Sequence, residues 1–290
     1  MKLALGGAQF GLAYGVANTS GQVALPEASR ILQMAYKQGV RVIDTAIAYG
    51  ESEKALGQVG VAGWNVISKL PEMPVDLLGV EAIGEWVEQQ VNGSLQRLKV
   101  DSLYGLLLHR PQQLLTEGGQ HLYRALKLMK QKGLVSKIGV SIYQPDELQP
   151  LFCNMSFDLV QAPLNVLDQR MVLSGWADRL YGLGVELHVR SAFLQGLLLM
   201  SDEQRPQKFG PWDAVWTTWR SWLNTNRLTP LEACLRYVYQ FPAVTQVVMG
   251  VDRASQLEAI LQVPEAHLPS LPSWGSFDDR LLNPARWGTL

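Results

Sequence analysis

Hydrophobic and polar positions along the chain follow two alternating patterns. Short apolar runs of strand length occur at 3–5, 40–43, 64–68, 102–108, 137–140, 158–160, 185–189 and 246–249. Between them, apolar residues return with the period of an α-helix at 26–38, 52–59, 80–98, 119–132, 145–152, 174–183, 212–224, 230–240 and 253–261. The first pattern is typical of buried strands and the second of amphipathic helices. We therefore predict eight strands that alternate with helices.

Residue types at the ends of these segments agree with this assignment. Thr229 and Pro230 form an N-cap followed by a proline in the first helical turn, and Gly133 stands where a helix gives way to a strand. No long linker or low-complexity segment interrupts the series. Residues 1–290 are therefore expected to form one domain.

Consecutive strand and helix pairs imply a parallel sheet, which is either open and doubly wound or closed into a barrel. An open dinucleotide-binding sheet carries a G-x-G-x-x-G turn after an early strand. The segment ALGGAQFG at residues 4–11 does not have that spacing. We therefore predict an α/β fold, a single (β/α)8 TIM barrel.

Composition narrows the class of protein. The 290 residues are 47% hydrophobic and 18% charged with a formal net charge of -1, and no run of Lys and Arg indicates a nucleic-acid partner. The longest apolar stretch, 197–200, is too short to cross a membrane, and the N-terminus reaches Gly6 and Gly7 before a signal-peptide core could form. Cys153 and Cys234 lie in apolar helical segments and are expected to be reduced core residues. These features predict a cytoplasmic protein, and they leave its oligomeric state open.

Polar residues stand where the predicted strands end. In a (β/α)8 barrel the active site is built at the carboxyl ends of the strands. The residues at these positions are Asp44, Lys69, His109, Ser141, Gln161, Arg190 and Gly250. Each ionisable one has an ordinary alternative on its own: a turn-capping aspartate, a loop lysine or a core histidine. Together at one end of a barrel, they indicate a site.

The ionisable groups among them suit the reduction of a carbonyl group. Tyr49 follows Asp44 by five positions, and a tyrosine has an ordinary pKa near about 10, which a nearby ammonium lowers. We expect Lys69 to supply the ammonium, Asp44 to keep it charged, and His109 to donate a hydrogen bond to the substrate oxygen. Hydride would come from a cofactor and the proton from Tyr49. The four histidines show no metal-like clustering, so no metal is expected.

The segment DTAIAYGESEKALG, residues 44–57, resembles the Asp-Thr-Ala and Tyr-Gly-x-Ser-Glu-x-x-Leu-Gly motif of the aldo-keto reductase family. The segments ISKL and LLLHRP follow in the order in which the family places its lysine and histidine. The resemblance continues through GVSIYQ, LVQAPLN, RSAFLQGLL and VVMGVDRASQLEAI. It implies a barrel that binds NADP(H), with NAD(H) as the alternative, and that reduces the carbonyl of small aldehydes or ketones, often sugars.

The resemblance also implies a role for individual residues. Tyr49 would be the general acid, and Lys69 would lower the pKa of Tyr49. Asp44 would be the counter-ion of the lysine, and His109 would donate the hydrogen bond that orients the carbonyl. Ser141 and Gln161 would hold the nicotinamide carboxamide. The remaining implied cofactor-binding residues are Gly7 and Arg190 near the nicotinamide, Ser191 and Leu194 at the pyrophosphate, and Gly250, Arg253 and Gln256 at the adenosine.

Several positions depart from the family pattern. Arg190 stands where an aromatic residue often stacks on the nicotinamide ring, and Ile142 and Ile260 replace asparagines. A guanidinium plane can stack in place of the aromatic ring, and it adds a positive charge there. Asp252 precedes Arg253, and a carboxylate disfavours a neighbouring 2′-phosphate. The choice between NADP and NAD therefore stays open.

Two residues are candidates for contact with substrate. Arg110 follows His109 and would bind a phosphate or carboxylate if it faces the site; the alternative is a surface arginine in an ion pair. Trp212 follows a loop that could close over the cofactor, whereas the other tryptophans of PWDAVWTTWRSWL are expected to pack a helix face on the barrel.

Three functions remain open at the level of sequence. The first is a carbonyl reductase for a polar, sugar-like aldehyde or ketone. The second is a sugar or alcohol dehydrogenase that runs the same site in the oxidative direction. The third is a non-catalytic barrel that binds a nucleotide.

Overall fold

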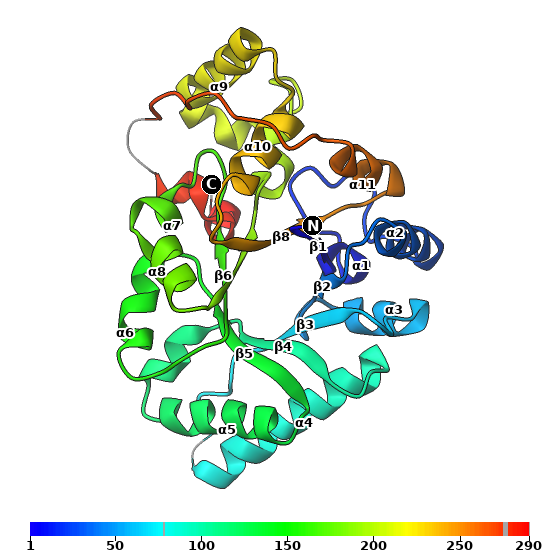
Figure 1. Ribbon diagram of the computed structural model, residues 1–290, viewed down its shortest axis with the longest axis vertical. Helices are drawn as coiled ribbons and strands as arrows, with labels where there is room; N and C mark the ends of the chain where they lie inside the picture. Colours follow the sequence, from blue (N-terminus) through cyan, green and yellow to red (C-terminus); the bar gives the residue numbers. More distant parts are fainter. Residues whose placement is uncertain (78, 275–277, 290) are drawn as a thin grey trace.

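In the computed structural model of the protein, residues 1–77, 79–274 and 278–289 are described. Within them, parallel strands close into a barrel in chain order, and the helices surround it (Figure 1). The strands are β1 (Leu3–Gly6), β2 (Val42–Asp44), β3 (Asn65–Leu70), β4 (Leu103–Leu108), β5 (Val135–Ser141), β6 (Leu159–Pro163), β7 (Glu186–Arg190) and β8 (Val244–Gly250). The predicted (β/α)8 TIM barrel is confirmed.

Helices of the predicted alternation follow the strands, and shorter ones occupy the loops. The longer helices are α2 (Leu25–Lys37), α3 (Ser52–Val59), α4 (Val80–Leu98), α5 (Gly119–Gln131), α6 (Leu148–Phe152), α8 (Trp176–Gly182), α9 (Asp213–Asn226), α10 (Pro230–Tyr239) and α11 (Ala254–Leu261). Three four-residue helices, α1 (Ala8–Gly11), α7 (Arg170–Leu173) and α12 (Asp279–Leu282), were not predicted, because segments this short show no period.

Two expectations about the chain need correction. The second strand begins at Val42 rather than at 40, because the N–H of Val40 still donates to Ala35 O at the end of α2. Cys234 is buried as expected, whereas Cys153 is exposed at the end of α6. No helix of the described residues combines the length and the apolar character needed to span a membrane.

The barrel separates two apolar regions. A small cluster of Ala4, Val42, Ile67, Leu107 and Leu159 fills its interior. A much larger core lies between the strands and the surrounding helices. Because both faces of the strands are covered, several of them, such as β1 and β4, are nearly continuous apolar runs, whereas β7 alternates polar and apolar residues. This is why their lengths, more than their periodicity, identified them.

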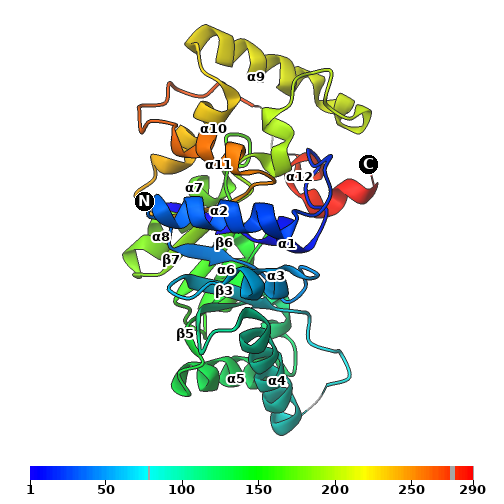
Figure 2. The same cartoon turned by 90° about the vertical axis from the view of Figure 1, so that its right-hand side faces the viewer.

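The tryptophans of α9 pack the helix, as expected. Trp216 and Trp219 are each 2% exposed, and Trp219 stacks on Trp222 with ring centroids 5.6 Å apart. Their indole N–H groups donate to backbone carbonyls, Trp216 to that of Phe209 at 3.0 Å. Helix α9 lies beside α10 at the outer edge of the molecule (Figures 1 and 2). The regular spacing of the indoles therefore reflects packing and not a sugar-binding stripe.

A polar cluster lies near the amino ends of the strands, away from the candidate site. Glu186 accepts hydrogen bonds from Tyr104 at 2.7 Å and from Lys137, and its other oxygen lies 3.2 Å from His188 Nε2. Burial raises the pKa of Glu186, but the hydrogen bonds from His188, Lys137 and Tyr104 outweigh burial and hold that pKa at about 2.

This cluster predicts a loss of stability in acid. Because the pKa of Glu186 in the folded protein lies below its ordinary value of 4.5, its stabilising effect is complete above that pH and is lost as the pH falls toward 2. With allowance for partial exposure, we expect the free energy of unfolding to drop by about 1 kcal/mol more in the wild type than in Glu186→Gln between about pH 6 and about pH 3. Urea denaturation at the two pH values measures this, and equal losses in both proteins would contradict it.

Candidate active site

Buried hydroxyl groups fix the segment after β2 against β1. Ser52 Oγ donates to Gly7 O at 2.7 Å and lies 2.8 Å from Thr45 Oγ1. A Cβ at Gly11 would lie 1.8 Å from Tyr49 O, so only glycine fits where α1 passes this segment. These contacts hold Tyr49 in place relative to the ends of both strands.

Asp44 and Lys69 form a buried ion pair at the ends of β2 and β3. Lys69 Nζ lies 2.6 Å from Asp44 Oδ1 and donates to Thr45 O at 2.8 Å. Gln161 Nε2 donates to Asp44 Oδ2 at 2.7 Å. The side chains of Lys69 and Asp44 are 0% and 5% exposed. A buried charge is tolerable when it is paired and its remaining lone pairs are used, as they are here.

Tyr49 and His109 lie beside this pair. Lys69 Nζ is 5.0 Å from the centroid of the Tyr49 ring, and the Tyr49 and His109 rings meet edge to face with centroids 5.5 Å apart. Burial, with the charges of Lys69, Arg190 and Arg110, lowers the pKa of His109 to about 3. The imidazole is therefore neutral and can donate one hydrogen bond without carrying charge.

The sequence predicts that Lys69 lowers the pKa of Tyr49, and this prediction is wrong. Burial is the largest effect on the pKa of Tyr49 and raises it, the Asp44 carboxylate raises it further, and the charge of Arg190 offsets only part. Burial likewise lowers the pKa of Lys69, against the opposing effect of Asp44. Tyr49 therefore stays a protonated phenol, which is the form that a proton donor needs.

A cavity of about 390 Å³ runs from Tyr49 and Asp44 to the first turns of α11. Six of the residues implied as cofactor-binding line it: Gly7, Gln161, Arg190, Ser191, Gly250 and Gln256. The other three lie outside its wall. Ser141 Oγ donates to Gln161 Oε1 at 3.3 Å, Leu194 is fully buried, and Arg253 is exposed beside Asp252.

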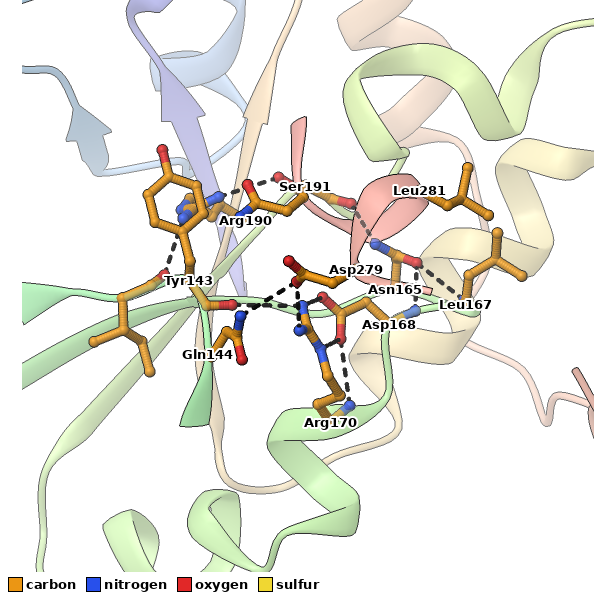
Figure 3. Close-up of polar contacts among 12 residues, drawn as sticks. Tyr143, Gln144, Asn165, Leu167, Asp168, Arg170, Arg190, Ser191, Asp279 and Leu281 are labelled. Carbon is orange, nitrogen blue, oxygen red and sulfur yellow. Dashed lines mark hydrogen bonds and ion pairs between the residues drawn. The ribbon is translucent and has the colours of Figure 1, made fainter. Parts of the chain in front are cut away.

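The two candidate substrate residues are not part of the cavity lining. Arg110 is 56% exposed and lies 3.8 Å from Glu72, which corresponds to the alternative of a surface ion pair. Trp212 is 8% exposed, and its Nε1 donates to Asp278 Oδ2 at 3.1 Å. The structure therefore places Trp212 against the C-terminal segment. The next residue of that segment, Asp279, accepts from Arg170 Nη1 at 3.1 Å (Figure 3).

The polar lining residues that the sequence did not identify include Gln9, Tyr14 and Asn18. A Cβ at Gly250 would lie 2.1 Å from the Gln9 amide, so the glycine that ends β8 makes room for Gln9. Gln195 Nε2 donates to Tyr14 Oη at 3.1 Å, which joins the loops after β7 and β1.

Arg190 ends β7 and lies beside the ring of Tyr143 (Figure 3). Its Cζ is 4.6 Å from the centroid of that ring. Its Nη2 donates to Ile142 O at 2.9 Å, and its Nη1 donates to Ser191 Oγ at 3.4 Å. The guanidinium is therefore fixed at the cavity wall by the residue that follows β7 and by the residue that follows β5.

Tyr49 and Asp44 line one end of the cavity, whereas Lys69 and His109 lie beside Tyr49 and are not among the lining residues. A barrel with this arrangement has the features of a carbonyl and alcohol oxidoreductase. The model of the aldo/keto reductase family matches residues 2–271. The chain therefore belongs to this family, whose members are NAD(P)H-dependent oxidoreductases that act on the carbonyl or alcohol groups of small molecules.

Individual relatives are distant. The chain is 27% identical over 175 residues to the glyoxal reductase of Bacillus subtilis strain 168, and the match covers 60% of each chain. The aldo-keto reductase AKR11C1 of Bacillus halodurans in its holo form has a TM-score of 0.71 at 20% identity, with coverage of 93% of this chain and 88% of that one. The glycerol dehydrogenase AKR11B4 of Gluconobacter oxydans has a TM-score of 0.69 at 18% identity, with coverage of 93% of this chain and 88% of that one. These two structures establish the shared fold alone.

Proposed function

We propose that this chain reduces the carbonyl of a polar, sugar-like aldehyde or ketone with NAD(P)H, and that Tyr49 is the general acid. The observation that supports this most is a protonated Tyr49 that lines one end of the cavity and lies beside both the Asp44 and Lys69 pair and neutral His109. We propose further that residues 1–290 act as one domain.

The residues divide the chemistry among them. A substrate oxygen placed between Tyr49 and His109 would accept hydrogen bonds from both, which polarises the carbonyl. When bound, the reduced nicotinamide supplies the hydride to the carbonyl carbon. Tyr49 gives its proton to the oxygen as the carbon–oxygen π bond breaks, and the Lys69 ammonium stabilises the phenolate that forms. Gln161, Arg190 and Ser191 line the part of the cavity beside these groups and would hold the nicotinamide end.

A paired titration with NADPH and NADH tests the proposal, followed by turnover. The names of two relatives suggest glyoxal for the reductive direction and glycerol for the oxidative one. Glyceraldehyde adds a sugar-like carbonyl compound. Binding with aldehyde-dependent consumption of reduced cofactor is the expected result. Binding without turnover on any of the three compounds would favour the non-catalytic barrel, and no binding of either dinucleotide would refute the proposal.

Two carboxylates near α11 bear on the choice of cofactor. Asp252 lines the cavity and accepts from Asn18 Nδ2 at 3.0 Å. Glu27 Oε1 accepts the N–H of Ala254, the first residue of α11, at 2.7 Å. A helix N-terminus favours an anion, and here the protein's own carboxylate already occupies it. The resemblance implied NADP first; these charges disfavour a 2′-phosphate, and we propose that NAD(H) is preferred.

Asp252→Asn is expected to raise the affinity for NADPH by about fivefold and to leave the affinity for NADH within about twofold, because the substitution removes a negative charge that only the 2′-phosphate would face. Isothermal titration calorimetry measures both values. Glu258→Gln makes the same change at an exposed site on α11 and should alter neither. Equal effects of Asp252→Asn on the two dinucleotides would contradict the assignment.

A further inference from the structure

Arg190 is a half-buried cation that lacks a carboxylate partner. Four other half-buried arginines of the described chain each pair with one: Arg97 with Glu53, Arg170 with Asp168, Arg205 with Asp202 and Arg236 with Glu232. No carboxylate oxygen of the described residues lies within 4.0 Å of Arg190. A partly buried charge without a counter-ion costs folding free energy. Its position on the wall of a cavity indicates a role toward a ligand.

The rest of the catalytic end is neutral in sum. The charges of Asp44 and Lys69 cancel as a pair 2.6 Å apart, and Tyr49 is a protonated phenol. His109 is an uncharged imidazole. Arg190 therefore gives this end one net positive charge. That charge acts on the pKa values of Tyr49, Lys69 and His109, so it reaches the groups around which substrate and nicotinamide have to meet.

The contacts that hold Arg190 are compatible with a flat ring as its ligand. Arginine recognises a carboxylate with two N–H groups in the plane of the guanidinium. In this chain Nη1 and Nη2 already donate to Ser191 Oγ and Ile142 O, and one face of the plane lies over the Tyr143 ring. Two of its five N–H groups are thus engaged within the protein, and the face of the guanidinium away from Tyr143 can stack on a planar group.

We infer that Arg190 makes the site bind the reduced nicotinamide more tightly than the oxidised nicotinamide, an inference that rests on the proposed function. The reduced ring is neutral and the oxidised ring is a cation, so a fixed guanidinium beside the ring repels only the oxidised form. Weak binding of the oxidised form speeds its release after each reduction. Weak binding also disfavours capture of the oxidised form for the reverse reaction.

Dissociation constants of NAD⁺, NADH, NADP⁺ and NADPH, measured by isothermal titration calorimetry, test this. In the wild type the reduced form should bind more tightly than the oxidised form of the same dinucleotide. Arg190→Gln should lower the ratio of oxidised to reduced Kd by about tenfold, mainly through tighter binding of the oxidised form. Arg190→Lys keeps the charge and should keep most of the ratio. Arg253→Gln removes the same charge near α11 and should change both forms alike.

The outcomes separate this inference from the function on which it rests. Binding of both oxidation states with a ratio that Arg190→Gln leaves unchanged overturns the inference and leaves the proposed function standing. Equal affinity of the wild type for both forms also overturns the inference and leaves the proposed function standing. This result does not depend on whether a variant folds. A KM that rises only for anionic aldehydes in Arg190→Gln, with an unchanged Kd ratio, would assign Arg190 to substrate instead. No binding of any dinucleotide overturns both.

Discussion

Tyr49→Phe is expected to lower kcat for aldehyde reduction about a thousandfold while the Kd of the reduced cofactor stays within about twofold. The substitution removes the phenol proton that the proposed mechanism places on the carbonyl oxygen, and His109, with a pKa of about 3, is not an imidazolium that could replace it at neutral pH. The ring of Tyr49 remains, so its edge-to-face contact with His109 is retained. Stopped-flow measurement of a single turnover separates this loss from slow product release.

Tyr123→Phe is the matched control for this change. It also removes a hydroxyl that donates a hydrogen bond, here to Ser156 O at 2.9 Å, but on α5 and outside the cavity lining. It should cost about 1 kcal/mol of stability and leave kcat unchanged. If Tyr49→Phe were to turn over aldehyde at the rate of this control, the general acid would have to be another group.

The sequence placed Asp44, Lys69 and Gln161 at one site because parallel strands of a closed barrel end at the same edge. That rule needs only the strand boundaries, and apolar runs define them well. All three do meet, with Gln161 and Lys69 on the two oxygens of Asp44. The rule says nothing about side-chain direction one residue further on. Arg110 comes directly after His109 and turns to the surface.

The features that the sequence did not predict correctly depend on the tertiary structure. From the sequence, a neighbouring ammonium was expected to lower the pKa of Tyr49. In the folded protein, burial is the larger effect and raises that pKa. The loop after β1, which brings Gln9, Tyr14 and Asn18 to the cavity, has no apolar period from which its path could be read. Trp212 has helical spacing with its neighbours, but only contact with Asp278 shows what it packs against.

Lys69→Met is expected to lower the free energy of unfolding by about 3–5 kcal/mol. Lys69 is fully buried, and its removal leaves the Asp44 carboxylate, 5% exposed, with Gln161 as its remaining hydrogen-bond donor. The loss measures an uncompensated buried charge rather than the net value of the ion pair. Urea denaturation of the wild type and the variant at neutral pH gives the difference.

Two further proteins decide whether the ion pair is the cause. In Asp44→Asn with Lys69→Met both charges are gone, so most of the stability should return even though reductase activity does not. Lys54→Met breaks an exposed pair with Glu51, whose side chains are 55% and 61% exposed, and should cost less than about 1 kcal/mol. A double variant no more stable than Lys69→Met would mean that the loss comes from packing around the lysine stem. Asp44 and Lys69 would then be kept together by catalysis and not by the energetics of burial.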